Sequence, residues 1–239
     1  MGSETDTQSR RRTIRSFVRR AGRLTPSQQR ALKELWPEFG VPFSRDPLQF
    51  EALFGRVAPV VLEIGFGNGD TLVQLAAEHP DLDFLGIEVH EPGVGHCLLE
   101  ARDAGVTNLR LVRHDAVEVL EAMIAPASLS RINLYFPDPW PKKRHHKRRL
   151  VQPAFLKLVA SRLSPDGTFN VATDWENYAE HIEAVVRESG LFECAEKRVH
   201  SGDQPLDRPV TKFERRGLRH GHRIHDWRFV QAGVASREL

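Results

Sequence analysis

The sequence predicts an α/β domain built on a mostly parallel, doubly wound sheet with helices on both faces. Three observations support this prediction. From residue 58 onward, short apolar runs alternate with longer segments of helical periodicity. The connections between them are only a few residues long, as right-handed crossovers between parallel strands allow. A chain of 239 residues is also long enough to bury one sizeable core.

The expected strands are short apolar runs of the kind that is buried on both faces of a parallel sheet. They lie at 59–64, 84–88, 109–112, 132–136 and 167–172, with two less regular strands near 192–198 and 226–231. The expected helices lie at 70–78, 92–104, 116–124, 153–163 and 175–188. This alternating order predicts a parallel sheet that is covered by helices on both sides.

The residues before this pattern form two parts. Residues 1–23 are polar and rich in arginine and lack apolar periodicity, so we interpret them as a flexible tail. The run from Ser9 to Arg12 is not followed by an apolar segment, which argues against a twin-arginine export signal; an organelle transit peptide stays open on composition. Residues 24–57 are expected to be a helical lead-in to a domain over 58–239.

One helix is expected in this lead-in, over residues 26–36. Thr25 offers an N-cap side chain, and Pro26 is the first-turn proline that helix starts favour. Pro37 is expected to end the helix, because a proline inside a helix removes a backbone donor and clashes with the preceding turn.

The composition is that of a soluble globular protein, with 40% hydrophobic and 28% charged residues. No apolar run approaches the roughly 20 residues that span a bilayer, so no membrane association is expected. Cys97 and Cys194 are too few for a disulfide framework or a cysteine-rich metal site. His145 and His146 lie among basic residues, which repel cations. We therefore expect a cytoplasmic protein without a bound metal, either a monomer or a homodimer.

The net charge of +2 conceals three basic blocks. The first is the tail, where residues 10–23 carry arginines and no acid. The second runs from 142 to 149, and the third contains Arg215, Arg216, Arg219, Arg223 and Arg228. Solvated surface explains a single block as well as a ligand does, but three together point to a polyanion such as nucleic acid.

Acidic residues follow the expected strands at one edge of the sheet. Ligands of open parallel sheets bind beyond the carboxyl ends of the strands. The first five strands each place an acid there, and these are Glu63, Glu88, Asp115, Asp138 and Asp174. A single such acid is usually a helix cap or a loop residue, but five in succession favour a binding site.

The glycine loop after the first strand distinguishes between two cofactors. Dinucleotide-binding loops have the spacing G-x-G-x-x-G and hold a pyrophosphate at a helix N-terminus. Here the spacing from Gly65 to Gly69 is G-x-G-x-G, and Asp70 takes the third position of that motif, where its charge opposes a pyrophosphate. Glu63 suits a cationic group, Glu88 the two hydroxyls of a ribose, and Asp115 an exocyclic amine. This combination fits S-adenosylmethionine, which carries no phosphate.

Six segments of the chain share their sequence and order with one enzyme family. They are Leu62–Gly69, Gly86–His90, Phe136–Lys142, Arg144–Arg149, Ala172–Trp175 and Thr211–Glu214. On these segments the chain resembles the single-subunit bacterial tRNA (guanine-N7)-methyltransferases, which modify guanine 46 in the variable loop, over about residues 48–231. The glycine loop occurs in many methyltransferases, whereas the Phe-Pro-Asp-Pro-Trp block and the later Thr-x-Phe-Glu are far more specific. The resemblance implies a Rossmann-like class I methyltransferase fold that uses S-adenosylmethionine and acts on tRNA.

The resemblance also implies roles for individual residues. The positions that match S-adenosylmethionine contacts are Glu63, Glu88, Asp115 and Asp138, and Asp138 also matches the family's proposed catalytic acid. Substrate-binding positions are matched by Lys142, Asp174, Thr211, Lys212, Phe213 and Glu214. The RNA-contacting block is matched by Arg144, His145, His146, Lys147, Arg148 and Arg149. The chain departs from the family at Pro141, where many relatives have histidine, and at His146, where asparagine is frequent; neither replaces an implied ligand.

The implied reaction needs no base, because N7 of guanine already has a free lone pair. We therefore interpret Asp138 as a residue that orients the guanine and balances its developing positive charge. Three other interpretations stay open. An amino-group methyltransferase acting on adenine or cytosine would explain Asp138-Pro139-Trp140, although the second proline of such loops is missing. A nicotinamide-dependent oxidoreductase is disfavoured by Asp70, and a non-catalytic RNA-binding module would leave the acids unexplained.

Overall fold

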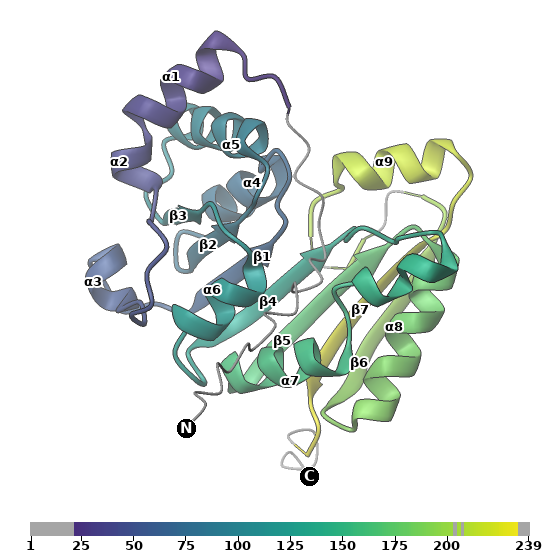
Figure 1. The fold of residues 1–239 in the computed structure, drawn as a ribbon. Coiled ribbons are helices and arrows are strands. Elements are labelled where there is room, and N and C mark those ends of the chain that lie inside the picture. Colours follow the sequence, from purple (N-terminus) through teal and green to yellow (C-terminus); the bar gives the residue numbers. More distant parts are fainter. Residues whose placement is uncertain (1–21, 203–204, 207, 234–239) are drawn as a thin grey trace, which may run out of the picture.

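The computed structural model describes residues 22–202, 205–206 and 208–233, which form one seven-stranded sheet flanked by helices (Figure 1). The strands are β1 (Val60–Ile64), β2 (Asp83–Ile87), β3 (Leu109–Val112), β4 (Leu129–Tyr135), β5 (Leu163–Thr173), β6 (Phe192–His200) and β7 (Ile224–Gln231). The helices are α1 (Pro26–Glu34), α2 (Trp36–Phe39), α3 (Phe50–Phe54), α4 (Asp70–Glu78), α5 (Glu91–Ala104), α6 (Ala116–Ala122), α7 (Pro153–Arg162), α8 (Glu176–Ser189) and α9 (Lys212–Arg219), with a 3-10 helix η1 (Lys143–Arg148).

The sheet has the strand order β3-β2-β1-β4-β5-β7-β6. β1 to β5 pair in parallel, and β7 lies antiparallel to both of its neighbours, β5 and β6. The predicted mostly parallel, doubly wound sheet is therefore confirmed. From the β1–β4 pair, β2 and β3 follow outward on one side, and β5 follows outward on the other. A ligand crevice is therefore expected at the carboxyl end of this pair.

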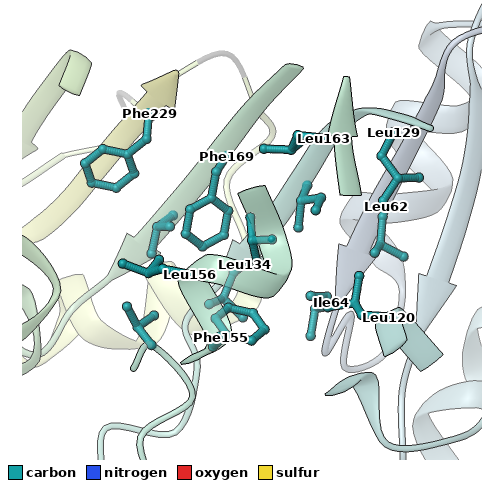
Figure 2. Packing of buried hydrophobic residues seen from close by; sticks show 14 of the residues in the cluster. Leu62, Ile64, Leu120, Leu129, Leu134, Phe155, Leu156, Leu163, Phe169 and Phe229 are labelled. Atoms are coloured by element: carbon teal, nitrogen blue, oxygen red, sulfur yellow. The ribbon is translucent and has the colours of Figure 1, made fainter. Parts of the chain in front are cut away.

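Each face of the sheet is covered by its own apolar cluster. On one face, α6, α7 and α8 pack across the strands, and Figure 2 shows Leu62, Leu134 and Phe169 of three neighbouring strands beside Leu120 and Phe155 of α6 and α7. On the other face, residues of α1, α2, α4 and α5 pack against β1, β2 and β3. Full burial of each large apolar side chain contributes about 1.5–3 kcal/mol, so these layers hold the strand ends in place.

Two sequence expectations differ from the structure around the sheet. Pro37 does not end a helix over 26–36: α1 ends at Glu34, and Pro37 lies in the first turn of α2. A proline is tolerated there because the first helical N–H groups have no intrahelical partner. In addition, α3, η1 and α9 were not expected from the sequence, since α3 has only five residues and η1 and α9 are short and mostly polar.

The amino-terminal part of the chain begins in the structure at Gly22. A side chain there would meet His90 and Pro92 at the start of α5. Most of the tail expected at residues 1–23 thus lies outside the described residues. Within the described ranges, no helix is long and apolar enough to cross a membrane.

Candidate active site

A pocket opens at the carboxyl edge of the sheet. It is lined by residues at or just after the ends of the first four strands, by the first residue of α6, by one residue after η1 and by one residue of α9. These residues are Ile64, Gly65, Gly67, Ile87, Glu88, Val89, His114, Ala116, Leu134, Tyr135, Phe136, Pro137, Asp138, Leu150 and Phe213. Of the five acids predicted at this edge, Glu88 and Asp138 line the pocket, whereas Glu63, Asp115 and Asp174 do not. The pocket therefore combines apolar walls with two carboxylates at the predicted switch point.

The glycine loop between β1 and α4 shapes one wall of this pocket. Gly65, Gly67 and Gly69 all have positive φ angles, of 71°, 62° and 87°, which favour glycine over other residues. A side chain at Gly69 would collide with Cys97, so packing alone explains that glycine. A side chain at Gly65 would meet no protein atom within 4 Å. The lack of a side chain at Gly65 thus leaves open space on the pocket side of the loop.

Glu88 ties the end of β2 to the glycine loop. Its carboxylate accepts hydrogen bonds from the backbone N–H groups of Gly67 at 2.9 Å, Val89 at 2.6 Å and His90 at 2.9 Å. These bonds use backbone donors from two loops that meet at the pocket. Glu88 therefore fixes the shape of the site and also presents a carboxylate to it.

Glu63 is buried in β1, with an exposed fraction of 4%, just before the glycine loop. Its Oε2 atom has no hydrogen-bond partner among the described residues. Burial raises the pKa of Glu63 to about 8, and the positive charge of Arg208 offsets only part of this shift. Asn133 and Asn170 pair in register with Glu63 across β4 and β5, and they also keep buried polar atoms without described partners. An unpaired carboxyl at this depth is suited to a buried cationic or hydrogen-bonding group.

Asp115 is the N-cap of α6. Its Oδ1 atom accepts hydrogen bonds from the N–H groups of Val117 at 2.8 Å and Glu118 at 3.4 Å. Its neighbours His114 and Ala116 line the pocket, although Asp115 itself does not. Asp115 therefore has the helix-capping role that is usual for an acid at the end of a strand. Capping uses only Oδ1, so Oδ2 can accept from another donor.

The loop that carries Asp138 has an unusual backbone. Phe136 and Trp140, on either side of Pro137-Asp138-Pro139, have positive φ angles of 51° and 47°. Such angles are costly for bulky residues and cluster at functional sites. Asp138 is exposed and lines the pocket, so the loop presents its carboxylate at the pocket mouth.

The basic block after this loop forms η1 and divides into outward and inward residues. Lys142, Lys143, Arg144 and Lys147 are exposed, while the Arg148 guanidinium lies 4.7 Å above the centre of the Trp140 ring. Arg149 is only 2% exposed, and it donates hydrogen bonds to Pro139 O at 2.9 Å and to the backbone and side chain of Asn177 at 3.2 and 2.8 Å. His146 likewise has a buried ring nitrogen. The exposed cations are thus held next to Asp138 by an arginine that points inward.

Asp174, at the end of β5, contacts α9 and the turn that follows it. Its Oδ2 atom lies 3.2 Å from the Nδ1 atom of His222. A Cβ atom at Gly217 would approach this carboxylate to 2.7 Å, so α9 packs directly against Asp174. Despite the histidines nearby, no group of three or more potential metal ligands gathers within the described ranges.

The segment Thr211–Glu214 forms the start of α9. Thr211 and Glu214 make a reciprocal capping box, in which the threonine side chain accepts from the backbone of Glu214 and the glutamate accepts from the backbone of Thr211. Glu214 is fully buried, whereas Lys212 and Phe213 are exposed, and Phe213 is 52% exposed at the pocket. Its ring lies 6.5 Å from that of Phe136. Two residues of this motif therefore build the helix start, and the other two face solvent.

Arg208 connects this helix start to the sheet. Its guanidinium donates to both carboxylate oxygens of Asp226 at 2.9 Å and to Glu214 at 2.5 Å. It also lies 5.1 Å from the Tyr135 ring centre and 5.5 Å from that of Phe136. Burial alone would lower the pKa of Arg208, but Asp226 and Glu214 raise it above its usual value. Arg208 was not among the residues predicted from the sequence; the pair of acids, Glu214 and Asp226, within an otherwise basic segment was the available signal.

Sequence comparisons agree with this geometry. A family model described as "Putative methyltransferase" matches residues 57–227. A tRNA (guanine-N(7)-)-methyltransferase of Aeromonas hydrophila is 56% identical, with 90% of this chain and 91% of the relative covered. A protein of the same name from Halorhodospira halophila is 53% identical, with 91% of this chain and 95% of the relative covered.

Solved structures show the same fold at low sequence identity. An antibiotic-related methyltransferase has a TM-score of 0.58 at 15% identity, over 80% of this chain and 96% of the other. A 16S rRNA (adenine(1408)-N(1))-methyltransferase of Catenulisporales acidiphilia, solved with its cosubstrate SAM, has a TM-score of 0.55 at 15% identity, over 80% of this chain and 93% of the other. These similarities place the sheet and its helices among methyltransferase folds.

Proposed function

The chain belongs to the tRNA (guanine-N(7)-)-methyltransferase family, and from this we propose that it transfers a methyl group from S-adenosylmethionine to N7 of guanine 46 in the variable loop of tRNA. The observation that carries the proposal is the position of Asp138. Its carboxylate stands at the mouth of the pocket, and the exposed cations of η1 follow directly in the chain. A nucleotide whose base enters the pocket would therefore have its flanking phosphates beside positive charge.

The residues at the carboxyl edge fit S-adenosylmethionine. The free space beside Gly65 would admit the amino acid end of the ligand. The unpartnered carboxyl of Glu63 offers a buried partner for the ammonium group of this end. Glu88 would accept hydrogen bonds from the ribose hydroxyls. Oδ2 of Asp115 would accept one from the exocyclic amine of the adenine. Asp138 completes this set at the pocket mouth. When bound, the cofactor supplies an electrophilic methyl group on a sulfonium.

Asp138 holds the guanine in line with this methyl group and balances the positive charge that the base gains. Guanine N7 carries a free lone pair, so no residue has to remove a proton from it. Alignment at near-attack distance can supply several kcal/mol of the barrier. A fixed carboxylate beside the developing charge adds electrostatic stabilisation, which is strongest where water is excluded.

We assign substrate contacts according to exposure. Lys142, Lys212 and Phe213 face solvent or the pocket, and we propose that the Phe213 ring packs on the guanine. Asp174 contributes by holding α9 and has part of its carboxylate accessible. Thr211 and Glu214 act through the capping box, which places Phe213.

Within the basic block, we propose that Arg144, His145, Lys147 and Arg148 contact the RNA backbone. Phosphate contacts position a folded RNA, which is selected largely by its shape. Arg149 and His146 are turned toward the protein, and we propose that they keep η1 in place.

The test is the nucleoside that the enzyme makes. The protein is incubated with a labelled methyl donor and a tRNA transcript, and the digested RNA is analysed by mass spectrometry. The expected product is N7-methylguanosine, and a transcript with adenine at position 46 is expected to acquire none. The proposal fails if the product is a methylated adenine or cytosine, if N7-methylguanosine does not form, or if replacement of guanine 46 leaves the yield unchanged.

A further inference from the structure

We infer that the exposed face of α9 is a second contact surface for the tRNA backbone, formed by Lys212, Arg216 and Arg219. The inference rests on the proposed function and extends the RNA surface from η1 to α9 on the same pocket rim. Lys212 already matches a substrate-binding position of the family, whereas the two arginines lie one and two turns further along α9. The surface fits the phosphates of the nucleotides that flank the target guanine.

The capping box and the buried side of α9 determine which residues face outward. Thr211, Glu214 and Gly217 are buried against the protein. Lys212, Arg216 and Arg219 are exposed, and their spacing of four and three residues places them on one side of the helix. At a rise of about 1.5 Å per residue, they form a row about 10 Å long.

This row carries positive charge that no acid of the described residues pairs with. Glu214 is the only acid in α9, and Arg208 pairs with it. Among the described residues, none forms a hydrogen bond or ion pair with the side chain of Lys212, Arg216 or Arg219. A polyanion would supply the missing counter-charges.

Two neighbouring arginines have structural uses instead. Arg215 donates to the backbone oxygen of Val210 at 2.9 Å, and Arg223 pairs with Glu176 at 3.2 Å. Stabilisation of the helix end is a simpler explanation for cations in α9, because positive charge near a helix C-terminus interacts favourably with the helix dipole. It does not explain Lys212, which lies in the first turn, where a cation is unfavourable.

The position of α9 relative to the pocket supports an RNA contact. Phe213, next to Lys212, lines the pocket, and the middle of the helix rests on Asp174 at the end of β5. η1 lies between Asp138 and Leu150, which both line the same pocket. Figure 1 shows α9 beyond the carboxyl ends of the central strands. An RNA strand that places its guanine in the pocket would thus have basic side chains near it from both η1 and α9.

The test compares two double variants that remove the same charge. Arg216→Gln with Arg219→Gln alters the surface, whereas Arg102→Gln with Arg187→Gln removes two exposed arginines from α5 and α8. The dissociation constant of a tRNA transcript is measured as a function of salt. Loss of two phosphate contacts is expected to reduce the slope of log K against log salt by about 1.4–1.8, and to weaken binding about 15- to 30-fold at 0.15 M salt.

The control pair is expected to bind tRNA like the wild type, and both pairs should bind S-adenosylmethionine. All four arginines lie in the last turn of their helices, so both pairs should show a similar small decrease in unfolding temperature. Arg216→Lys with Arg219→Lys retains the charge and should restore most of the affinity and slope. The inference is overturned if the Gln pair in α9 keeps the wild-type slope, or if the control pair loses as much affinity. The proposed function fails separately, if the wild type forms no N7-methylguanosine on the same transcript.

Discussion

The strongest structural prediction concerns Arg208, which joins β4, β7 and α9. Its guanidinium pairs with Asp226 and Glu214, both almost fully buried, and it stacks near Tyr135 and Phe136. Arg208→Met removes the cation with a side chain of similar length. The substitution leaves two carboxylates without their main partner in a place that water hardly reaches.

The expected loss follows from this geometry. Removal of one partner of a buried ion pair typically costs about 3–5 kcal/mol, because the remaining charge stays desolvated. His200 lies 3.1 Å from Asp226 and 3.7 Å from Glu214, so it can offset part of the cost at both carboxylates, and Glu214 also keeps its capping bond. We therefore expect Arg208→Met to lower the free energy of unfolding by about 3–5 kcal/mol in urea titrations. This corresponds to a fall in melting temperature of about 6–20 °C for a domain of this size.

A triple variant separates charge from packing. Glu214→Gln and Asp226→Asn added to Arg208→Met remove the uncompensated charges, and glutamine can still complete the capping box. The triple variant should recover more than half of the lost stability. A free energy of unfolding for Arg208→Met within about 1 kcal/mol of the wild-type value, a loss typical of an ordinary substitution, would refute the stabilising role of the buried ion pairs. A triple variant as unstable as the single one would assign the loss to stacking on Tyr135 and Phe136.

Three further predictions concern the site. Asp138→Asn should lower kcat by about 100-fold or more through lost charge stabilisation; near-normal turnover with intact cofactor binding would contradict this role. Burial raises the pKa of Glu63 to about 8, so the folded protein retains a proton that the unfolded chain releases above its ordinary value of 4.5. The free energy of unfolding of the wild type should therefore fall relative to that of Glu63→Gln as pH rises from about 4.5 to 8. The same pH dependence of this free energy in both proteins would contradict the raised pKa. Arg149→Ala should lower the free energy of unfolding by about 2–3 kcal/mol through its lost hydrogen bonds. Arg144→Ala should leave stability unchanged and weaken tRNA binding. Equal effects of the two substitutions on stability would show that Arg149 does not hold η1.

The sheet was predictable from the sequence because its strands are short apolar runs with polar ends. The same pattern placed Asp138 and Glu88 at one edge, and both line the pocket. It also predicted a helix at 70–78, which the structure contains with those bounds. These features depend on local periodicity and on the rule that parallel strands present their carboxyl ends together.

The roles within the basic and acidic segments could not be predicted in this way. Arg149 is one of several consecutive cations, and only the fold shows that it is buried against Pro139 and Asn177. Arg208 depends on contacts with residues from three separate elements, and no spacing in the sequence indicates them. Glu214 also belongs to a motif implied to bind substrate, yet its hydrogen bonds are used for the helix start and for Arg208.

Arg149 and Arg208 have a common consequence for the site. Each is buried, and each anchors one exposed basic segment: Arg149 holds η1 through the backbone of Pro139, and Arg208 holds α9 through Glu214. The cations that face solvent are therefore attached to backbone that is fixed before RNA arrives. A preorganised surface loses less conformational entropy on binding than a mobile one, so more of the phosphate attraction remains as affinity. The two inward arginines would thus contribute to tRNA binding without touching the RNA.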